Sequence, residues 1–191
     1  MIKNHFLLVF ICLAMTAAGC VVITEEDEPQ ETNPEYTLKL SVDRIIVNLT
    51  CEGVNGDEQE ADIYTKLIIS EGVSYPPTIA EQDYTLVQLG LGEQSTNTGL
   101  AVEVDVEFED MTQFNAHIDT YENDPGGVRD ISKFFGKSIQ FDEASECWRF
   151  NGDCLNGSET FPHEFKLALY TRMSDNRCDI EYHWTFELVA S

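Results

Sequence analysis

The sequence predicts an all-β protein, an antiparallel β-sandwich of about eight strands. Apolar and polar residues alternate at Leu38, Leu40 and Val42, and again over 102–108, where apolar residues alternate with carboxylates. A period of two is typical of strands with one face in the core and the other in water. Turn residues separate these segments, and no long helical repeat of apolar residues occurs.

The other strands are expected from the same alternation and from clusters of β-branched and aromatic residues. Besides 38–42 and 102–108, we expect strands over 44–50, 63–70, 84–91, 113–121, 136–141, 147–150, 165–173 and 180–189. Residues 128–135 are at most a short helical turn. The sequence contains no internal repeat and no apolar stretch long enough to cross a bilayer as a helix.

Residues 1–19 are predicted to be a signal peptide. Lys3 gives a basic start, 6–14 is an apolar run, and small residues precede Cys20. The pattern resembles the lipobox of bacterial lipoproteins, although Ala17 stands where that family usually carries Leu or Val. The resemblance implies removal of residues 1–19 and fatty acylation of Cys20, including palmitate, which would anchor the protein to a membrane. An ordinary secretory signal is the alternative.

Residues 20–35 are predicted to be an acidic tether, followed by one β-sandwich domain over 36–191. The tether has two prolines, four consecutive acids at 25–28 and few apolar residues, so we expect it to be disordered. An acidic cluster after the lipidated cysteine is similar to signals that move lipoproteins to the cell surface. By the same resemblance, Val21 rather than Asp after the cysteine implies that the protein is not retained at the inner membrane. We therefore expect a surface-exposed outer-membrane lipoprotein.

The charge of the chain excludes some partners. There are 35 Asp and Glu against 11 Lys and Arg, a net charge of −24. Removal of the predicted signal peptide, which contains Lys3, would make the net charge more negative. Such a protein repels nucleic acid and anionic lipid surfaces. Cations are its natural counterparts.

The cysteines predict two disulfides. Cys12 lies in the signal segment and Cys20 is the expected lipidation site, so Cys51, Cys147, Cys154 and Cys178 remain. Four cysteines allow three connectivities. We favour Cys147 with Cys154, because Asn151-Gly152 between them is a strong hairpin turn. Cys51 with Cys178 then follows by elimination.

Two acidic segments are candidate calcium sites. Residues 51–62 and 122–130 are rich in Asp and Glu, contain Gly and Asn for bends, and each follows an apolar strand. Calcium prefers six to eight oxygen ligands, which short acidic side chains on turns supply. The alternative is that both segments are solvated acidic turns.

Over 36–141 the chain resembles a C2 domain, the calcium-dependent β-sandwich family. Residues 62–67 (DIYTKL) are similar to the family's acidic residue and following strand, and the acids of the second segment match its spacing ahead of Gly136. The resemblance implies a calcium site whose ligands are Asp62, Glu122, Asp124 and Asp130, with Asp57 as a partner. Three features depart from the pattern. Asp57 is one residue closer to Asp62 than is usual in the family, Glu122 stands in place of Asp, and Ile63 stands in place of proline.

No catalytic motif appears in the sequence. His117 and Asp119 are spaced to share one face of a strand and could be hydrogen-bonded, which is more typical of structure than of catalysis. Trp148 and Trp184 are candidate ligand-stacking residues, although packing of Trp148 against a disulfide is the simpler interpretation. We therefore expect a non-catalytic, calcium-stabilised envelope module that binds a protein or glycan. The alternatives are a lipocalin-like ligand carrier and an envelope hydrolase.

Overall fold

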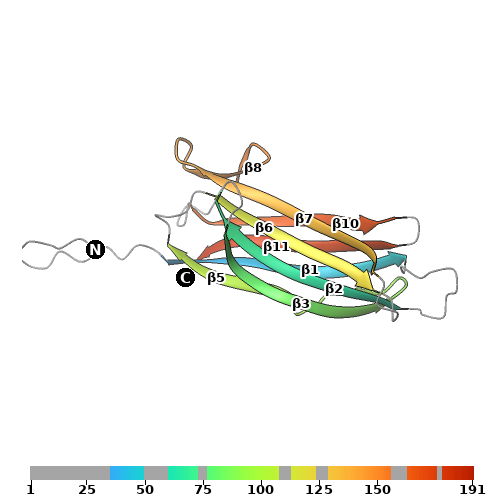
Figure 1. Cartoon of the computed structure of the whole chain (residues 1–191). Coiled ribbons are helices and arrows are strands. Elements are labelled where there is room, and N and C mark those ends of the chain that lie inside the picture. The colour runs from blue at the N-terminus through green and yellow to red at the C-terminus, as the bar shows by residue number, and fades with distance from the viewer. Residues whose placement is uncertain are drawn as a thin grey trace, which may run out of the picture. The chain divides into compact units, whose positions relative to one another are not determined.

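The computed structural model describes residues 35–49, 60–72, 77–107, 113–123, 129–155, 163–175 and 178–191, with Glu35, Arg129 and Asp130 described by backbone alone. These residues form eleven strands (Figure 1). They are β1 (Glu35–Leu49), β2 (Glu60–Glu71), β3 (Thr78–Gly90), β4 (Gln94–Ser95), β5 (Ala101–Glu107), β6 (Gln113–Asn123), β7 (Arg129–Asp142), β8 (Cys147–Phe150), β9 (Asp153–Leu155), β10 (Phe165–Ser174) and β11 (Asp179–Ala190).

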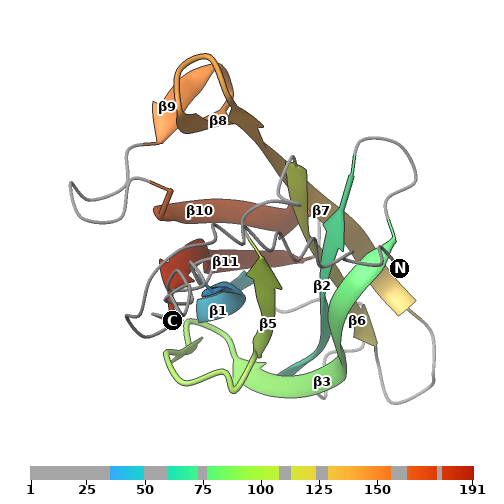
Figure 2. The same cartoon turned by 90° about the vertical axis from the view of Figure 1, so that its left-hand side faces the viewer.

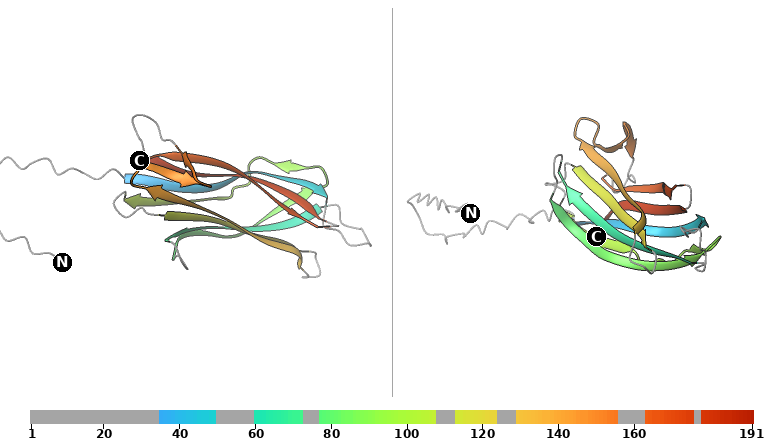
Figure 3. Two further views of the ribbon diagram at one scale, coloured as in Figure 1. Left: turned by 90° about the horizontal axis from the view of Figure 1, so that it is seen from above. Right: turned by 45° about the vertical axis from the view of Figure 1, so that its right-hand side comes forward.

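The strands form two antiparallel sheets, which confirms the predicted sandwich. One sheet has the order β10-β11-β1, and both β4 and β5 pair with the far side of β1. The other has the order β3-β2-β6-β7-β8-β9. Figures 2 and 3 show the sheets as two separate layers. Within the described residues the strands therefore form a sandwich and not the closed barrel of the lipocalin alternative.

The N-terminal strand is central to its sheet. The two segments expected at 38–42 and 44–50 form one strand, β1, with a bulge between Val42 and Arg44. A bulge inserts one residue and resets the alternation. Val42 before it and Ile45 after it therefore both face the core. Because the alternation is interrupted between them, the sequence predicts two strands where there is one.

The core is made by the inward residues of both sheets. An aromatic chain crosses it, in which Phe114 stacks on Trp148, Trp148 contacts Phe165 edge-on, and Phe165 contacts Phe186, each at 5.5 Å between ring centroids. All four side chains are buried. Burial of large rings is the main source of stability in such a core.

A polar contact also lies in the core. The Tyr182 hydroxyl and Thr120 Oγ1 are 2.6 Å apart, and Thr120 Oγ1 lies 3.2 Å from Thr65 Oγ1. Burial raises the pKa of Tyr182 well above its ordinary value. The phenol therefore stays neutral, and its hydrogen bond compensates for lost water.

The described part of the segment 128–135, from Arg129, is not the expected helical turn, and Val128 lies outside the described residues. From Arg129 onward the residues are the first half of β7, paired in register with β6. Phe135 faces inward opposite Ile118, and its neighbour Phe134 faces outward and is 60% exposed. Adjacent phenylalanines on opposite faces remove the simple alternation that identifies a strand.

Candidate functional site

The structure brings the strand ends that border the two acidic segments together. β2 pairs with β6 so that Ile63 lies opposite Glu122, and β6 pairs with β7 so that Asn123 lies opposite Arg129. The beginning of β2 and the end of β6 therefore lie at the same end of one sheet (Figure 1). Asp57 and Asp124 fall outside the described residues, and Asp130 is placed by its backbone alone.

Asp62 and Glu122 leave this sheet on opposite faces. Glu122 shares the inward face of β6 with Thr120 and is 2% exposed. Asp62 shares the outward face of β2 with Tyr64, and its Oδ1 accepts a hydrogen bond of 2.7 Å from Gln88 Nε2. The structure thus brings the two strand ends together but separates these two carboxylates.

Among the described residues, no three His, Cys, Asp or Glu side chains gather closely enough to hold a metal ion. The calcium set of Asp57, Asp62, Glu122, Asp124 and Asp130 depends largely on side chains outside this part of the chain. Calcium binding therefore stays a prediction.

The outward face of the β3-β2-β6-β7 sheet carries an aromatic surface that we did not predict. We call it the tyrosine face and define it by Tyr64, Tyr84, Leu86, Tyr121 and Phe134. Register places Leu86, Tyr64 and Tyr121 side by side in one row across β3, β2 and β6. Phe134 lies one row further, opposite Asp119.

The rings of the tyrosine face hold one another in position. Tyr64 stacks on Tyr121 with centroids 5.0 Å apart, and Tyr84 contacts Tyr121 edge-on at 5.1 Å. Tyr84 also donates its hydroxyl proton to Asp119 Oδ2. Tyr84, Leu86 and Phe134 are nevertheless 39%, 43% and 60% exposed. The surface is therefore ordered and accessible.

Polar side chains surround these rings. Gln88 donates to Asp62, as described above, and Lys66 Nζ lies 2.9 Å from Glu81 Oε2. The hydrogen bond with Glu81 is the main reason that the pKa of Lys66 is raised. The tyrosine face is thus bordered by fixed donors and acceptors.

His117 and Asp119 share the outward face of β6, as their spacing predicts, but they have different partners. His117 stacks on Phe134 at 4.9 Å and lies 3.4 Å from Ser70 Oγ, and Asp119 accepts from Tyr84. Burial lowers the pKa of His117. The ring lies over Gly136, where a Cβ would come within 2.8 Å of Nδ1. This histidine therefore packs as a structural residue.

The Cys147–Cys154 disulfide is confirmed. It closes the hairpin of β8 and β9, whose turn places Asn151 and Gly152 at positive φ angles of 52° and 92°. Such angles are those that an Asn-Gly hairpin turn adopts. Cys178 is also in a disulfide, but Cys51 lies outside the described residues, so their pairing stays a prediction.

Both tryptophans are buried and neither offers a ligand platform. Trp148 and Trp184 are 0% exposed. Trp148 packs in the aromatic chain of the core, and its Nε1 donates to the His163 carbonyl at 2.7 Å. Trp148 is therefore a packed residue, as expected, and the partners that the structure shows are core aromatic rings.

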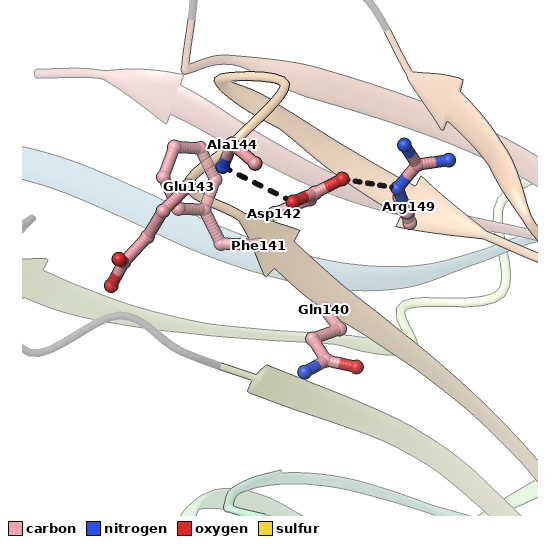
Figure 4. A pocket seen from close by; sticks show the side chains of 6 residues that line it. All are labelled: Gln140, Phe141, Asp142, Glu143, Ala144 and Arg149. Atoms are coloured by element: carbon pink, nitrogen blue, oxygen red, sulfur yellow. Dashed lines mark hydrogen bonds and ion pairs between the residues drawn. The ribbon is translucent and has the colours of Figure 1, made fainter.

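An open pocket lies where β7 meets β8 (Figure 4). Gln140, Phe141, Asp142, Glu143, Ala144 and Arg149 line it. Arg149 Nε donates to Asp142 Oδ2 at 2.6 Å and lowers the pKa of that carboxyl. Within the pocket, Asp142 and Arg149 therefore neutralise each other.

The described residues include no helix of the length and apolar character needed to span a bilayer. No protein-family model matches the chain, and no curated protein matches it. Among solved structures, a C2 domain of plant Extended Synaptotagmin 1 aligns with a TM-score of 0.37 and 10% identity, over 84% of this chain and 98% of that one. The β-sandwich assignment itself depends on the strand pairing given above.

Proposed function

We propose that the protein is a non-catalytic binding module of the bacterial cell envelope, held at the outer membrane by lipid on Cys20, with the tyrosine face as its binding surface. The observation that carries this proposal is the exposure of Tyr84, Leu86 and Phe134 together on one sheet face. Outward positions of a solvated sheet are usually polar. Exposed aromatic groups on a rigid surface are typical of binding sites.

A non-catalytic role is supported by the partners of the described acid–base groups. His117 is engaged by Phe134 and Ser70, and His183 by Arg44, whose Nη2 lies 3.2 Å from His183 Nε2. Asp142 is paired with Arg149. A general acid or base must instead reach a substrate from a cleft.

Calcium is proposed as a stabilising ion at the end where β2 begins and β6 ends. The support is the antiparallel pairing of Ile63 with Glu122, which attaches both acidic segments to that end. Crowded carboxylates repel one another, and a cation would remove that repulsion.

The binding role is tested by co-sedimentation with washed envelopes of the producing bacterium. The mature protein with Cys20→Ser, which has no lipid of its own, should sediment with the envelopes. Tyr84→Ala and Phe134→Ala should reduce the bound fraction severalfold. Tyr170→Ala is the matched control, because Tyr170 is 51% exposed on the opposite sheet. Equal sedimentation of all variants would contradict the proposal.

The lipid anchor is tested separately. Mass spectrometry of the N-terminal peptide should find a mature chain that starts at acylated Cys20. In a chain that also carries Tyr84→Ala and Phe134→Ala, so that binding through the tyrosine face is weakened, Cys20→Ser should release the protein from membranes, because the anchor requires the thiol. Cleavage elsewhere, or an unmodified Cys20, would overturn the lipoprotein assignment.

A further inference from the structure

We propose that the ligand of the tyrosine face is a neutral glycan. This inference depends on the proposed function. A sugar ring has apolar C–H faces and a rim of hydroxyl groups. Tyr84 presents both matching features, since the residue is 39% exposed and its hydroxyl is bound to Asp119. The negative face of an aromatic ring attracts C–H groups that carry partial positive charge.

The rings need little reorganisation before a ligand stacks on them. Tyr64 and Tyr121 are stacked with an interplanar angle of 11°, and Tyr84 is fixed between Tyr121 and Asp119. Side chains that are ordered before binding lose less entropy on binding. Four adjacent strands about 4.8 Å apart carry the surface, so it extends roughly 14 Å, enough for a short oligosaccharide.

Around the rings lie the polar groups that sugar hydroxyls need. Gln88 has an exposed amide beside the Asp62 carboxylate, and Lys66 lies beside Glu81. Hydroxyls both donate and accept, so they bind next to carboxylate, amide and ammonium groups alike. A few such groups around an apolar surface fix a ligand's orientation.

Charge distinguishes a neutral glycan from other occupants. The chain has a net charge of −24, and next to the rings Asp62, Glu81 and Asp119 outnumber Lys66. An anionic polysaccharide, a nucleic acid or an anionic lipid surface would be repelled. A second copy of this chain brings the same charge. A neutral glycan has no such cost.

The distribution of apolar groups also favours a sugar over a protein partner. Among the described residues of this face, Leu86, Tyr64, Tyr84 and Tyr121 adjoin one another. Phe134 is set apart from them by the polar positions Asp119 and Ser132. Protein interfaces centre on a contiguous, desolvated apolar core. Two small apolar groups with polar positions between them instead match the apolar faces and hydroxyl rims of successive sugars.

The experiment is calorimetric titration of the mature Cys20→Ser protein with neutral hexasaccharides of glucose, mannose and N-acetylglucosamine. Hexamers of galacturonate are the anionic comparison. We expect at least one neutral series to bind. Tyr84→Ala and Phe134→Ala should each raise its Kd by about tenfold, the size of one lost aromatic contact. Tyr170→Ala should leave the Kd unchanged, and melting curves confirm that each variant is folded.

Three results would overturn the inference: no binding of any neutral hexasaccharide at millimolar concentration, equal binding by the wild type and the Tyr84 and Phe134 variants, or tighter binding of galacturonate. If every oligosaccharide fails while envelope sedimentation still depends on Tyr84 and Phe134, the glycan class is wrong and the binding module stands. If sedimentation also loses that dependence, the proposed function falls with it.

Discussion

Replacing Trp148 with alanine should lower the free energy of unfolding by about 3 to 5 kcal/mol, the usual cost of removing a fully buried large aromatic side chain. Trp148 is 0% exposed and contacts Phe114, Phe141 and Phe165. It therefore joins the β8 hairpin to the core of both sheets. Urea unfolding monitored by circular dichroism would measure the change.

Two conservative variants separate packing from hydrogen bonding at this position. Trp148→Phe removes ring volume and also the donor to the His163 carbonyl. Trp184→Phe removes the same volume, but Trp184 Nε1 is buried with no hydrogen-bond partner among the described residues. Trp148→Phe should therefore cost about 1 kcal/mol more than Trp184→Phe.

A cost below about 1 kcal/mol for Trp148→Ala would mean that the β8 hairpin is not part of the cooperative core.

Calcium should stabilise the protein by about 2.7 kcal/mol when its free concentration is one hundred times the dissociation constant. The ion would bind the folded state at the end where the two acidic segments attach. The melting temperature should then rise with calcium and fall with a chelator. Magnesium should substitute poorly, because it requires stricter octahedral geometry.

Asp124→Asn and Asp130→Asn should remove most of the calcium response. Glu107→Gln is the control, because Glu107 is exposed and pairs with Glu35 at the start of β1, the opposite end of that strand from the acidic segment after Leu49. That variant should respond like the wild type. No change in the melting temperature at millimolar calcium would mean that the two acidic segments are solvated turns that bind no calcium.

The sequence was sufficient for the sandwich because most strands bury one face. β6 and β10 alternate buried and accessible residues, and their bounds differ from the predicted ones by at most two residues. The Asn151-Gly152 turn fixed the pairing of Cys147 and Cys154, because the two-residue hairpin brings their Cα atoms to 5.7 Å. A contact can be predicted from the sequence when a local turn brings its two residues together without help from distant segments.

The remaining features depend on pairing between distant segments. β4 has two residues and pairs with β1 at Ile45 and Ile46, so its existence depends on the neighbour more than on its own sequence. The tyrosine face also depends on the pairing of strands that are distant in sequence. Tyr64 and Tyr121 were both placed on strands, but their adjacency depends on the β2–β6 register. The separation of Asp62 from Glu122 follows from that register too, since it sets which residues share a face.

The pairing of the first and last strands affects how the protein folds. Tyr36 pairs with Ala190, so β1 gains β11 as its neighbour only when the C-terminal residues are available. β5 is available earlier on the other side of β1. When the chain is synthesised or exported N-terminus first, one edge of β1 therefore stays unpaired until β11 has emerged. Contacts so distant in sequence slow folding, and an open edge is a template for aggregation during that interval.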